Sequence, residues 1–537
     1  MQKFSFPISS QKLILLAALY FGIVLNMGFW RFIYEHISLD DWSTGLFLLS
    51  LPAFLCIPLI VFFSIIIVPY LAKPLLITFL FVSAAANYAM FKLGVFIDAE
   101  MYQNIIETNT REATDLITWS FIAWFMVTAI IPAVFIVRAQ IQYSRPINDI
   151  WQRLKQIFIC LIIIACFAPF TYKEYVSFGR NNREVRKLVN TFNYIHSVNK
   201  YYKLQARANR KFVILDAAPH MSTKDNSKIK LLVLIVGETA RAQNFALYGY
   251  NRPTNPELTK QNIITFADTS SCGTATAVSL PCMFSHQERT KFKVGDARYT
   301  QNLVDILQAA GNYVFWREND DGCKGICDRV DYEDVTQNSG QQFCFSDYCQ
   351  DDALLNGLEQ KISNLTRNSV IILHTMGSHG PTYYKRYPDR YKKFTPTCDS
   401  ADIQNCTKEQ IVNTYDNTIV YTDHIISSAI DILKQYPQYQ SSLIYISDHG
   451  ESLGENGIYL HGLPYRIAPD TQTKIPFLLW MSDQEKQTGK IDEQCLRQNA
   501  ISRQFSHDNL FHSVLGLMNT VTTVYKPELD VFAPCRR

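Results

Sequence analysis

Carboxylate and imidazole side chains follow several apolar runs of the sequence, at the places where predicted strands end. Carboxylates and imidazoles together favour zinc, and a catalytic zinc keeps one coordination position open for substrate or nucleophile. A lone histidine at a strand end is more often a structural residue, and Asp-His-Gly can be only a turn that caps a helix. Because several such residues converge on one edge of one predicted sheet, we interpret them as a metal site and its surroundings. They are Glu238, His374, His379, Asp448, His449 and His461.

A second chemical feature is the stretch "SSCGTATAVSLPCMF" (270–284), which places five hydroxyl groups beside Cys272 and Cys282. If a helix starts from Thr274 onward, a hydroxyl there lies at the positive end of the helix dipole, near N–H groups that can hold a phosphate. A hydroxyl is a weak nucleophile until a metal lowers its pKa. The alternative is a polar turn that the two cysteines close for stability. Spacing alone does not select one hydroxyl. Lys324 in "CKGIC" can neutralise phosphate charge, although taken alone it is better explained as a solvated lysine.

The elements that must position these residues begin at Lys230. Continuous apolar runs such as "KLLVLIVGE", "YVFWREND", "NSVIILHTMG" and "SSLIYISDHGE" alternate with helical stretches such as "TQNLVDILQAAG". This alternation predicts an α/β fold with a mainly parallel sheet covered on both faces. In open sheets of this kind, ligands bind at the carboxyl ends of the strands.

The first part of the chain has a different composition. Five predominantly apolar runs are each near the roughly 20 residues that a helix needs to cross a bilayer. Their loops alternate in charge, and the basic loops, with Lys12, Lys73 and Arg145 among them, stay inside. The pattern predicts a cytoplasmic amino terminus and places everything after Thr171 outside. No cleavage site follows the first run, so we do not interpret it as a signal peptide. The runs are residues 13–30, 45–68, 75–96, 117–137 and 156–171.

Cysteine usage agrees with this topology. Of 13 cysteines, ten follow residue 270, in the part predicted to lie outside, where an oxidising compartment permits disulfides. The spacings lack the paired CxxC units of structural zinc sites, so a zinc cluster is the poorer interpretation. The expected pairs are Cys272–Cys282, Cys323–Cys327, Cys344–Cys349 and Cys398–Cys406, which leaves Cys495 with Cys535.

Three domains are therefore expected: a transmembrane domain of five helices (1–171), a bridging segment (172–229) and an outer catalytic domain (230–537). The bridging segment is basic and rich in tyrosine, which fits an amphipathic helix on the membrane surface or an ordinary linker helix. The net charge of +3 gives no reason to expect a nucleic-acid partner.

Several long motifs carry a resemblance to a known family: "VGETAR", "TSSCGTATAVSLPCMFS", "LHTMGSHGPTYYKRYP", "SDHGESLGENGIYLHGLPY" and "FSHDNLFHSVLGL". With five apolar runs before them, they resemble the phosphoethanolamine transferases that modify lipid A, including the mobile colistin-resistance enzymes. The resemblance covers essentially the whole chain. It implies an alkaline-phosphatase/sulfatase-like periplasmic domain anchored in the inner membrane of a Gram-negative bacterium, and a monomer is expected.

Carried over residue by residue, the resemblance implies that Thr276, rather than a neighbouring hydroxyl, is the nucleophile. It also implies that Glu238, Thr276, Asp448 and His449 hold zinc. His374, His379, His461 and Lys324 would line the substrate site, and the histidines would donate protons or bind a second zinc. On a predicted outer helix, Asn104, Thr108 and Glu112 recur at four-residue spacing and would contact the ethanolamine headgroup, although an ordinary surface helix explains them equally well.

The reaction that follows is a two-step phosphoryl transfer. The resemblance implies that phosphatidylethanolamine is the donor and lipid A the acceptor. Cells that carry the product are then expected to resist polymyxin and cationic peptides, because a negative phosphate is masked. Within the same fold, the acceptor can instead be another envelope glycan or the group can be phosphoglycerol. A hydrolytic sulfatase or phosphatase is a different class, and the C/S-x-P-x-R context of sulfatases does not surround Thr276. A non-catalytic receptor would have no chemical need for ligands and nucleophile together.

Overall fold

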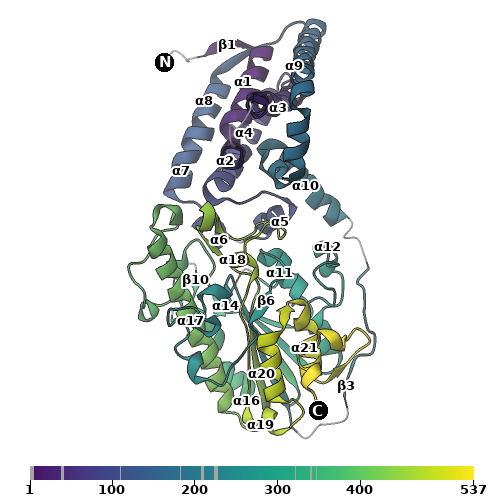
Figure 1. The fold of residues 1–537 in the computed structure, drawn as a ribbon, viewed down its shortest axis with the longest axis vertical. Helices are drawn as coiled ribbons and strands as arrows, with labels where there is room; N and C mark the ends of the chain where they lie inside the picture. Colours follow the sequence, from purple (N-terminus) through teal and green to yellow (C-terminus); the bar gives the residue numbers. More distant parts are fainter. Residues whose placement is uncertain are drawn as a thin grey trace. The chain divides into compact units, whose positions relative to one another are not determined.

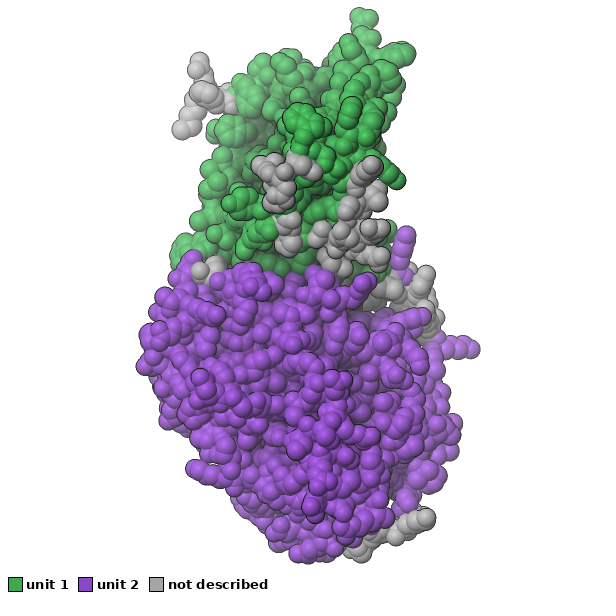
Figure 2. Space-filling model, in the orientation of Figure 1, with its two compact units in different colours: residues 1–102, 117–200 green, residues 103–116, 201–537 purple. Residues whose placement is uncertain are grey.

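A computed structural model describes residues 5–37, 42–108, 110–181, 183–206, 211–222, 228–320, 322–338, 342–345 and 348–537. The chain forms two compact units (Figure 2). Unit 1 comprises residues 1–102 and 117–200, and unit 2 comprises residues 103–116 and 201–537. Each unit has its own apolar core, so each is described separately.

Unit 1 contains the apolar helices. Within the described residues, five helical segments are long and apolar enough to cross a membrane: Ser10–Glu35, Trp42–Ile66, Ala72–Leu93, Trp119–Arg138 and Pro146–Tyr172. They are built from α1 (Ser10–Ile23), α2 (Met27–His36), α3 (Trp42–Ile66), α4 (Ala72–Tyr88), α7 (Trp119–Phe125), α8 (Ile131–Arg138) and α9 (Pro146–Asn181).

The packing of unit 1 explains two sequence features. Helix α3 contains Pro52 and Pro58 and still runs unbroken from Trp42 to Ile66. Its buried face packs Ile60 and Phe63 with Phe21 of α1 and Leu80 of α4. Two short strands, β1 (Phe6–Ser9) and β2 (Ala139–Gln142), pair in parallel. The segment predicted as a bridge (172–229) includes the end of α9, α10 (Asn190–Ala206) and β3 (His220–Met221); its residues 182, 207–210 and 223–227 lie outside the described residues.

Unit 2 is built around a seven-stranded sheet of order β5-β15-β12-β4-β11-β7-β8. Strands β12, β4, β11, β7 and β8 run parallel to one another, and β15 and β5 add two antiparallel pairings at the β12 edge. This is the mainly parallel α/β sheet that the alternating runs predict. The strands are β4 (Lys230–Gly237), β5 (Ile264–Thr265), β7 (Tyr313–Glu318), β8 (Asp331–Asp334), β11 (Ser369–His374), β12 (Gln440–Ser447) and β15 (Phe477–Met481).

Helices cover both faces of this sheet (Figure 1). The core on one face joins Leu232 and Leu234 of β4 to Leu280, Leu307 and Phe511. Because strands buried on both faces need no polar side, β4, β11 and β12 are buried along their whole lengths. The main covering helices are α11 (Thr276–Met283), α13 (Leu303–Ala309), α20 (Glu493–Ser502) and α21 (Asp508–Leu517), with α17 (Lys408–Lys434) on the opposite face.

Five disulfides lie in unit 2, in the pairs expected from the spacing: Cys272–Cys282, Cys323–Cys327, Cys344–Cys349, Cys398–Cys406 and Cys495–Cys535. The three cysteines of the apolar runs, Cys56, Cys160 and Cys166, are free. Two short helices of the outer loop, α5 (Ala99–Glu107) and α6 (Thr110–Asp115), contribute residues 103–115 to this unit.

Candidate active site

Four adjacent parallel strands end at the candidate site. The register pairs Gly237 of β4 with Ser447 of β12, and Val236 of β4 with His374 of β11. His374 in turn pairs with Glu318 of β7. Glu238 and Asp448 therefore begin the loops after two neighbouring strands, beside His374. Parallel pairing thus brings residues that are more than a hundred positions apart to one sheet edge.

Thr276 is the first residue of α11, directly after the extended residue Ala275. Its hydroxyl donates a hydrogen bond to Glu238 Oε2 at 3.1 Å and lies 3.4 Å from Nε2 of His449. The first backbone N–H groups of a helix have no partner within the helix, and they carry the positive end of its dipole. The hydroxyl is therefore at a place suited to a negatively charged phosphoryl group.

The ligand-type atoms converge on this hydroxyl. His449 Nε2 lies 3.2 Å from Asp448 Oδ2 and 3.5 Å from Glu238 Oε1. Nδ1 of His449 lies 2.9 Å from the carbonyl oxygen of Gly450, which fixes Nδ1 as the protonated nitrogen and leaves the lone pair of Nε2 directed at the cluster. Burial, helped by the charges of nearby histidines, holds the pKa of His449 well below its usual range, so the ring is neutral, as a metal ligand requires.

These residues fit a zinc ion. Glu238, Asp448 and His449 are fully buried and offer ligand atoms within 4.8 Å of one another. Asp448 Oδ2 is buried and makes no hydrogen bond with the described residues, which is costly for a carboxylate unless a cation compensates it. Two carboxylates, an imidazole and a hydroxyl are a donor set that zinc accepts.

A second group of ligand atoms shares Glu238. Asp320 and His374 join it within the same 4.8 Å limit. His374 Nδ1 bonds Glu318 Oε1 at 2.8 Å, and Nε2 lies 3.7 Å from Asp320 Oδ2. Burial acts to lower the pKa of His374, but the charge of Glu318, followed by those of Asp320 and Asp448, raises this pKa to about 9. His374 therefore belongs to an acidic cluster beside the nucleophile.

His379 and His461 form a pair on another side of the site. The ring centroid of His461 lies 4.5 Å from that of His449 and 5.6 Å from that of His379. His461 Nδ1 lies 2.9 Å from Glu451 Oε2, so this nitrogen donates and Nε2 remains the free acceptor or, when protonated, the proton donor. Glu451 also accepts the Tyr383 hydroxyl at 2.6 Å. Glu451 thus fixes the orientation of His461.

The loop that carries Thr276 is held by a buried histidine. His507 accepts a hydrogen bond from the N–H of Cys272 at Nδ1 (2.9 Å), and its Nε2 lies 2.8 Å from the carbonyl of Ser447. Burial lowers the pKa of His507 to about 4, so the ring is neutral and Nε2 donates. One side chain therefore joins the disulfide-closed loop to the end of strand β12.

The remaining predicted residues lie farther from these contacts. Lys324 is in the short loop closed by Cys323–Cys327 and lines a separate pocket of unit 2. Asn104 and Thr108 lie at the end of α5, where the Thr108 hydroxyl donates to the Asn104 carbonyl at 2.7 Å. Glu112 is in α6, but its side chain lies outside the described residues.

Sequence reasoning missed several members of the site. Asp320 and Glu318 end the strand "YVFWREND", so the same rule that selected Glu238 could have found them. Glu451 lies two residues after His449 and looks like an ordinary loop carboxylate. Arg386 contacts the site at the backbone carbonyl of His379, and Asp115 is linked to the site through its ion pair with Arg386; no sequence pattern indicates such contacts.

The fold and the site define a sulfatase-like domain. A family model described as "Sulfatase" matches residues 230–520, more than half of the chain. A second family model, described as "Phosphoethanolamine transferase EptA/EptB", matches residues 55–206. The chain belongs to the phosphoethanolamine transferase EptA family, within the sulfatase-like superfamily, and it is a multi-pass membrane protein.

Two curated relatives illustrate this membership. Phosphoethanolamine transferase EptA of Escherichia coli K12 is 43% identical over 530 residues, which cover 98% of this chain and 96% of the relative. Phosphatidylethanolamine transferase Mcr-1 of Escherichia coli is 34% identical over 472 residues, 85% of each chain. The resemblance to the EptA and Mcr enzymes is therefore confirmed over nearly the full length.

Solved structures agree. The integral membrane protein lipooligosaccharide phosphoethanolamine transferase A (EptA) from Neisseria meningitidis is 39% identical, covers 99% of both chains and superposes with a TM-score of 0.96. The periplasmic domain of EptC from Escherichia coli, solved in complex with zinc, is 26% identical with a TM-score of 0.50, covering 59% of this chain and 91% of that one.

Proposed function

We propose that the chain transfers phosphoethanolamine from phosphatidylethanolamine to a phosphate group of lipid A, with Thr276 carrying the group between two steps. The observation that carries this proposal is the position of the Thr276 hydroxyl, 3.1 Å from Glu238 and 3.4 Å from His449 at the start of α11. The names of the relatives support the transferred group, the phosphatidylethanolamine donor and a lipooligosaccharide acceptor.

In the first step, Thr276 Oγ1 attacks the phosphorus of phosphatidylethanolamine, and the bond from phosphorus to the glycerol oxygen breaks. The hydroxyl proton passes to the neighbouring Glu238 carboxylate. His461 or His379 donates a proton to the leaving diacylglycerol oxygen. Lys324 is assigned to neutralise the phosphate charge that develops in the transition state.

In the second step, an oxygen of a lipid A phosphate attacks the phosphothreonine, and the bond from phosphorus to Thr276 Oγ1 breaks. Glu238 returns its proton to the threonine oxygen, and the acceptor phosphate gives its O–H proton to the histidine that donated in the first step. The acceptor then leaves with phosphoethanolamine attached. The added amine masks the negative phosphate, so expressing cells bind polymyxin and other cationic peptides less strongly.

The zinc site belongs to this proposal. Glu238, Thr276, Asp448 and His449 would hold one ion, and the histidine pair or the cluster of Asp320 and His374 offers ligands for a second. A zinc ion held there would lower the pKa of the threonine hydroxyl and stabilise negative charge on the phosphoryl oxygens. The zinc complex of the EptC periplasmic domain supports this assignment.

The proposed setting is the inner membrane of a Gram-negative bacterium, with a cytoplasmic amino terminus and a periplasmic catalytic domain. Both substrates are then lipids, which explains why a sulfatase-like domain carries five apolar helices. Asn104, Thr108 and Glu112 keep their proposed role as contacts of the ethanolamine headgroup.

Mass spectrometry of lipid A from a Gram-negative host tests the proposal. Cells expressing the wild-type chain should show a phosphoethanolamine addition, and cells expressing Thr276→Ala should show none. Thr276→Ser keeps the hydroxyl and should retain measurable transfer. The proposal fails if wild-type protein shown to be in the membrane produces no addition, or if Thr276→Ala produces the same addition as wild type.

A further inference from the structure

The backbone directly after Glu238 is strained. Thr239 has φ 52°, in the left-handed region that a β-branched residue seldom adopts. Thr239 is fully buried, and its hydroxyl oxygen makes no hydrogen bond with the described residues, so its side chain does not compensate the strain. Strained residues persist only where their surroundings enforce the conformation, and they gather at functional sites. Neighbouring residues must therefore hold the peptide between Glu238 and Thr239 in place.

Two hydrogen bonds hold Thr239 itself. Its N–H donates to Oδ1 of Asp448 at 3.2 Å, and its carbonyl oxygen accepts the hydroxyl of Tyr415 at 2.6 Å. Tyr415 lies in α17 and is fully buried, and its hydroxyl also accepts the N–H of Arg241 at 3.0 Å. The strained residue is therefore fixed to the loop after β12 and to the long covering helix.

A turn after strand β11 holds the backbone of Glu238. The N–H of Ser378 donates to the Glu238 carbonyl oxygen at 3.0 Å. Gly377 has φ +50°, and a Cβ at this position would lie 2.7 Å from the Glu238 carbonyl oxygen and 3.1 Å from its amide nitrogen. Because these are backbone atoms in a close-packed interior, a side chain at position 377 would displace Glu238. The turn fits against Glu238 only because residue 377 is glycine.

Asp351 holds this turn with one buried carboxylate. Its Oδ1 accepts the N–H of Met376 at 2.8 Å, and its Oδ2 accepts the N–H of Gly377 at 3.0 Å. Oδ1 also accepts the side-chain amide of Asn319, which follows β7, at 2.7 Å. Because Asp351 is only 3% exposed, water does not substitute for these bonds, and a buried N–H without an acceptor is costly. The carboxylate therefore ties together the loops that follow β7 and β11.

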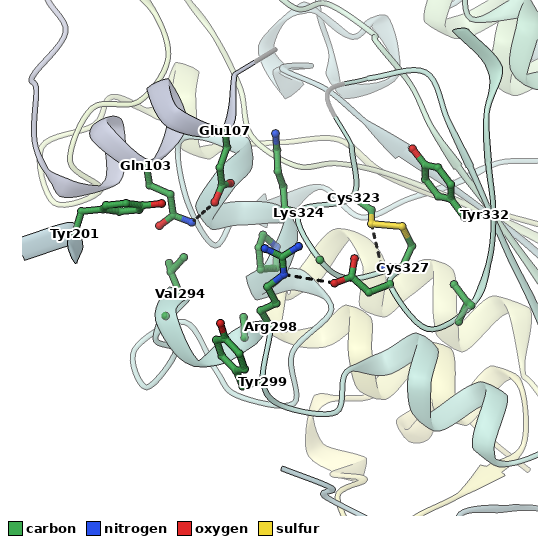
Figure 3. Close-up of a pocket in the computed structure, with 16 residues that line it drawn as sticks. Gln103, Glu107, Tyr201, Val294, Arg298, Tyr299, Cys323, Lys324, Cys327 and Tyr332 are labelled. Carbon is green, nitrogen blue, oxygen red and sulfur yellow. Dashed lines mark hydrogen bonds and ion pairs between the residues drawn. A yellow bond between two sulfur atoms is a disulfide. The ribbon is translucent and has the colours of Figure 1, made fainter. Parts of the chain in front are cut away.

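We propose that Asp351 is a positioning residue for Glu238. Through the turn at Gly377 it fixes the Glu238 carboxylate, which accepts the Thr276 hydroxyl at 3.1 Å. Asp351 makes no hydrogen bond with Glu238 or Thr276 in the structure, so it acts through the turn. Neither Asp351 nor Gly377 lines the pocket around Lys324, so substrate binding there does not depend on them (Figure 3). The inference rests on the proposed function and extends it, because it makes the proposed proton acceptor and zinc ligand depend on a carboxylate outside the reacting groups.

Asp351→Asn tests this role in the full-length protein in detergent. The variant presents an NH2 group in place of one carboxylate oxygen, so one N–H of the turn loses its acceptor and Glu238 is released. Zinc affinity is measured by competition with a chelator. Formation of the phosphoethanolamine adduct on Thr276 is timed at saturating zinc, with phosphatidylethanolamine varied and lipid A absent. We expect the zinc Kd to rise and the maximal adduct rate to fall, each about tenfold. The phosphatidylethanolamine concentration that gives half the maximal rate should stay at the wild-type value.

Asp352→Asn is the matched control, because Asp352 is the next residue and carries the same group. Its carboxylate lies 3.1 Å from Arg390 Nη2 and accepts the Tyr421 hydroxyl at 2.9 Å, and it makes no hydrogen bond with the turn. The control should keep the wild-type zinc Kd and adduct rate. A zinc Kd that is unchanged in Asp351→Asn, or raised equally in both variants, would overturn the positioning role.

Gly377→Ala tests the same contact from the turn, and it decides the question if Asp351→Asn does not fold. The added Cβ displaces Glu238 while Asp351 stays intact. Gly489→Ala is its control, because Gly489 has a similar φ of +65° but a Cβ there would meet nothing within 4 Å. Both variants therefore carry backbone strain, and only Gly377→Ala should raise the zinc Kd, again about tenfold. Equal zinc Kd values in the two glycine variants would overturn the role. If the wild-type chain forms no Thr276 adduct, the proposed function fails, and the zinc Kd values still decide whether Asp351 positions Glu238.

Discussion

Asp115 and Arg386 form a buried ion pair, with Oδ2 and Nη2 3.3 Å apart and both side chains less than a tenth exposed. Thr382 and Lys385 also donate hydrogen bonds to Asp115, each at 2.7 Å. Burial alone would raise the pKa of Asp115, but these donors and the charge of Arg386 hold it below its usual range. Arg386 Nε donates to the carbonyl of His379 at 2.8 Å. The Asp115–Arg386 pair therefore joins α6 to His379, a candidate proton donor.

This link predicts that Arg386→Lys slows transfer. A lysine keeps the charge near Asp115 but cannot bond both that carboxylate and the His379 carbonyl with the fork geometry of arginine. We expect kcat to fall about tenfold or more with little change in KM. Lys385→Gln is the control, because Lys385 contacts Asp115 without contacting His379. Equal losses of kcat in the two variants would show that transfer depends on the ion pair with Asp115 and not on the position of His379.

Removal of metal should lower both activity and stability. A ligand that binds only the folded state stabilises it by about 4 kcal/mol at a concentration 1,000 times its Kd. A chelator should therefore abolish transfer and lower the unfolding midpoint of the wild-type protein, and added zinc should restore both. In Glu238→Gln the midpoint should respond little to chelator, because a ligand is missing. An identical drop in midpoint in the two proteins would contradict zinc binding by Glu238.

His507 should matter for both folding and chemistry. His507→Gln removes the bridge between the Cys272 N–H and the Ser447 carbonyl, at a cost of about 1–3 kcal/mol. His512→Gln is the comparison. His512 is buried like His507, but it lies within α21 and accepts a hydrogen bond from the Lys526 N–H, away from the Thr276 loop. Formation of the covalent phosphoethanolamine adduct on Thr276 should slow in His507→Gln and stay near the wild-type rate in His512→Gln. Similar adduct rates at similar stabilities would argue against a positioning role.

Asp423 gives a pH dependence of stability. Burial raises the pKa of this α17 carboxyl to about 7, although the N–H groups of Glu257 and Leu258 donate to it. An unfolded Asp titrates near about 4. Between these two values the folded state keeps a proton that the unfolded chain has lost, so this stabilising contribution is complete below about pH 4 and is lost as pH rises to about 7.

Asp423→Asn should remove that contribution. Its unfolding free energy should fall less than that of wild type between pH 5 and pH 7, with the slopes differing by up to about 1.4 kcal/mol per pH unit. Unfolding midpoints measured across this range check the difference. Parallel curves would show that Asp423 is ionised in the folded protein throughout.

The sequence predicted the sheet and its ligand-bearing edge because both depend on local patterns. Runs such as 230–237 and 440–447 are apolar at nearly every position, which is typical of strands buried on both faces, and Glu238 and Asp448 follow them directly. Which strands are neighbours depends on packing along the whole chain. For that reason the grouping of Asp320 with Glu238 and His374 appeared only in the structure.

The positioning contacts were beyond sequence reasoning for a different reason. Glu451 and His507 act through single hydrogen bonds whose geometry no spacing encodes. The choice of Thr276 among five nearby hydroxyls came from family resemblance, and the structure places it at the start of α11, beside Glu238. Lys324 looked like a solvated lysine in the sequence, and its surroundings became visible only with the pocket.

The order of the strands has a consequence for how the protein matures. Strand β12 lies beside β4 in the sheet, yet it begins only at Gln440. A nascent chain that has not reached this strand already contains Glu238, Thr276 and His374, but it lacks Asp448 and His449, and β4 lacks one neighbour. If the proposed metal site forms, metal binding would therefore be a late event in folding, and a chain truncated before residue 440 would be unable to assemble the site.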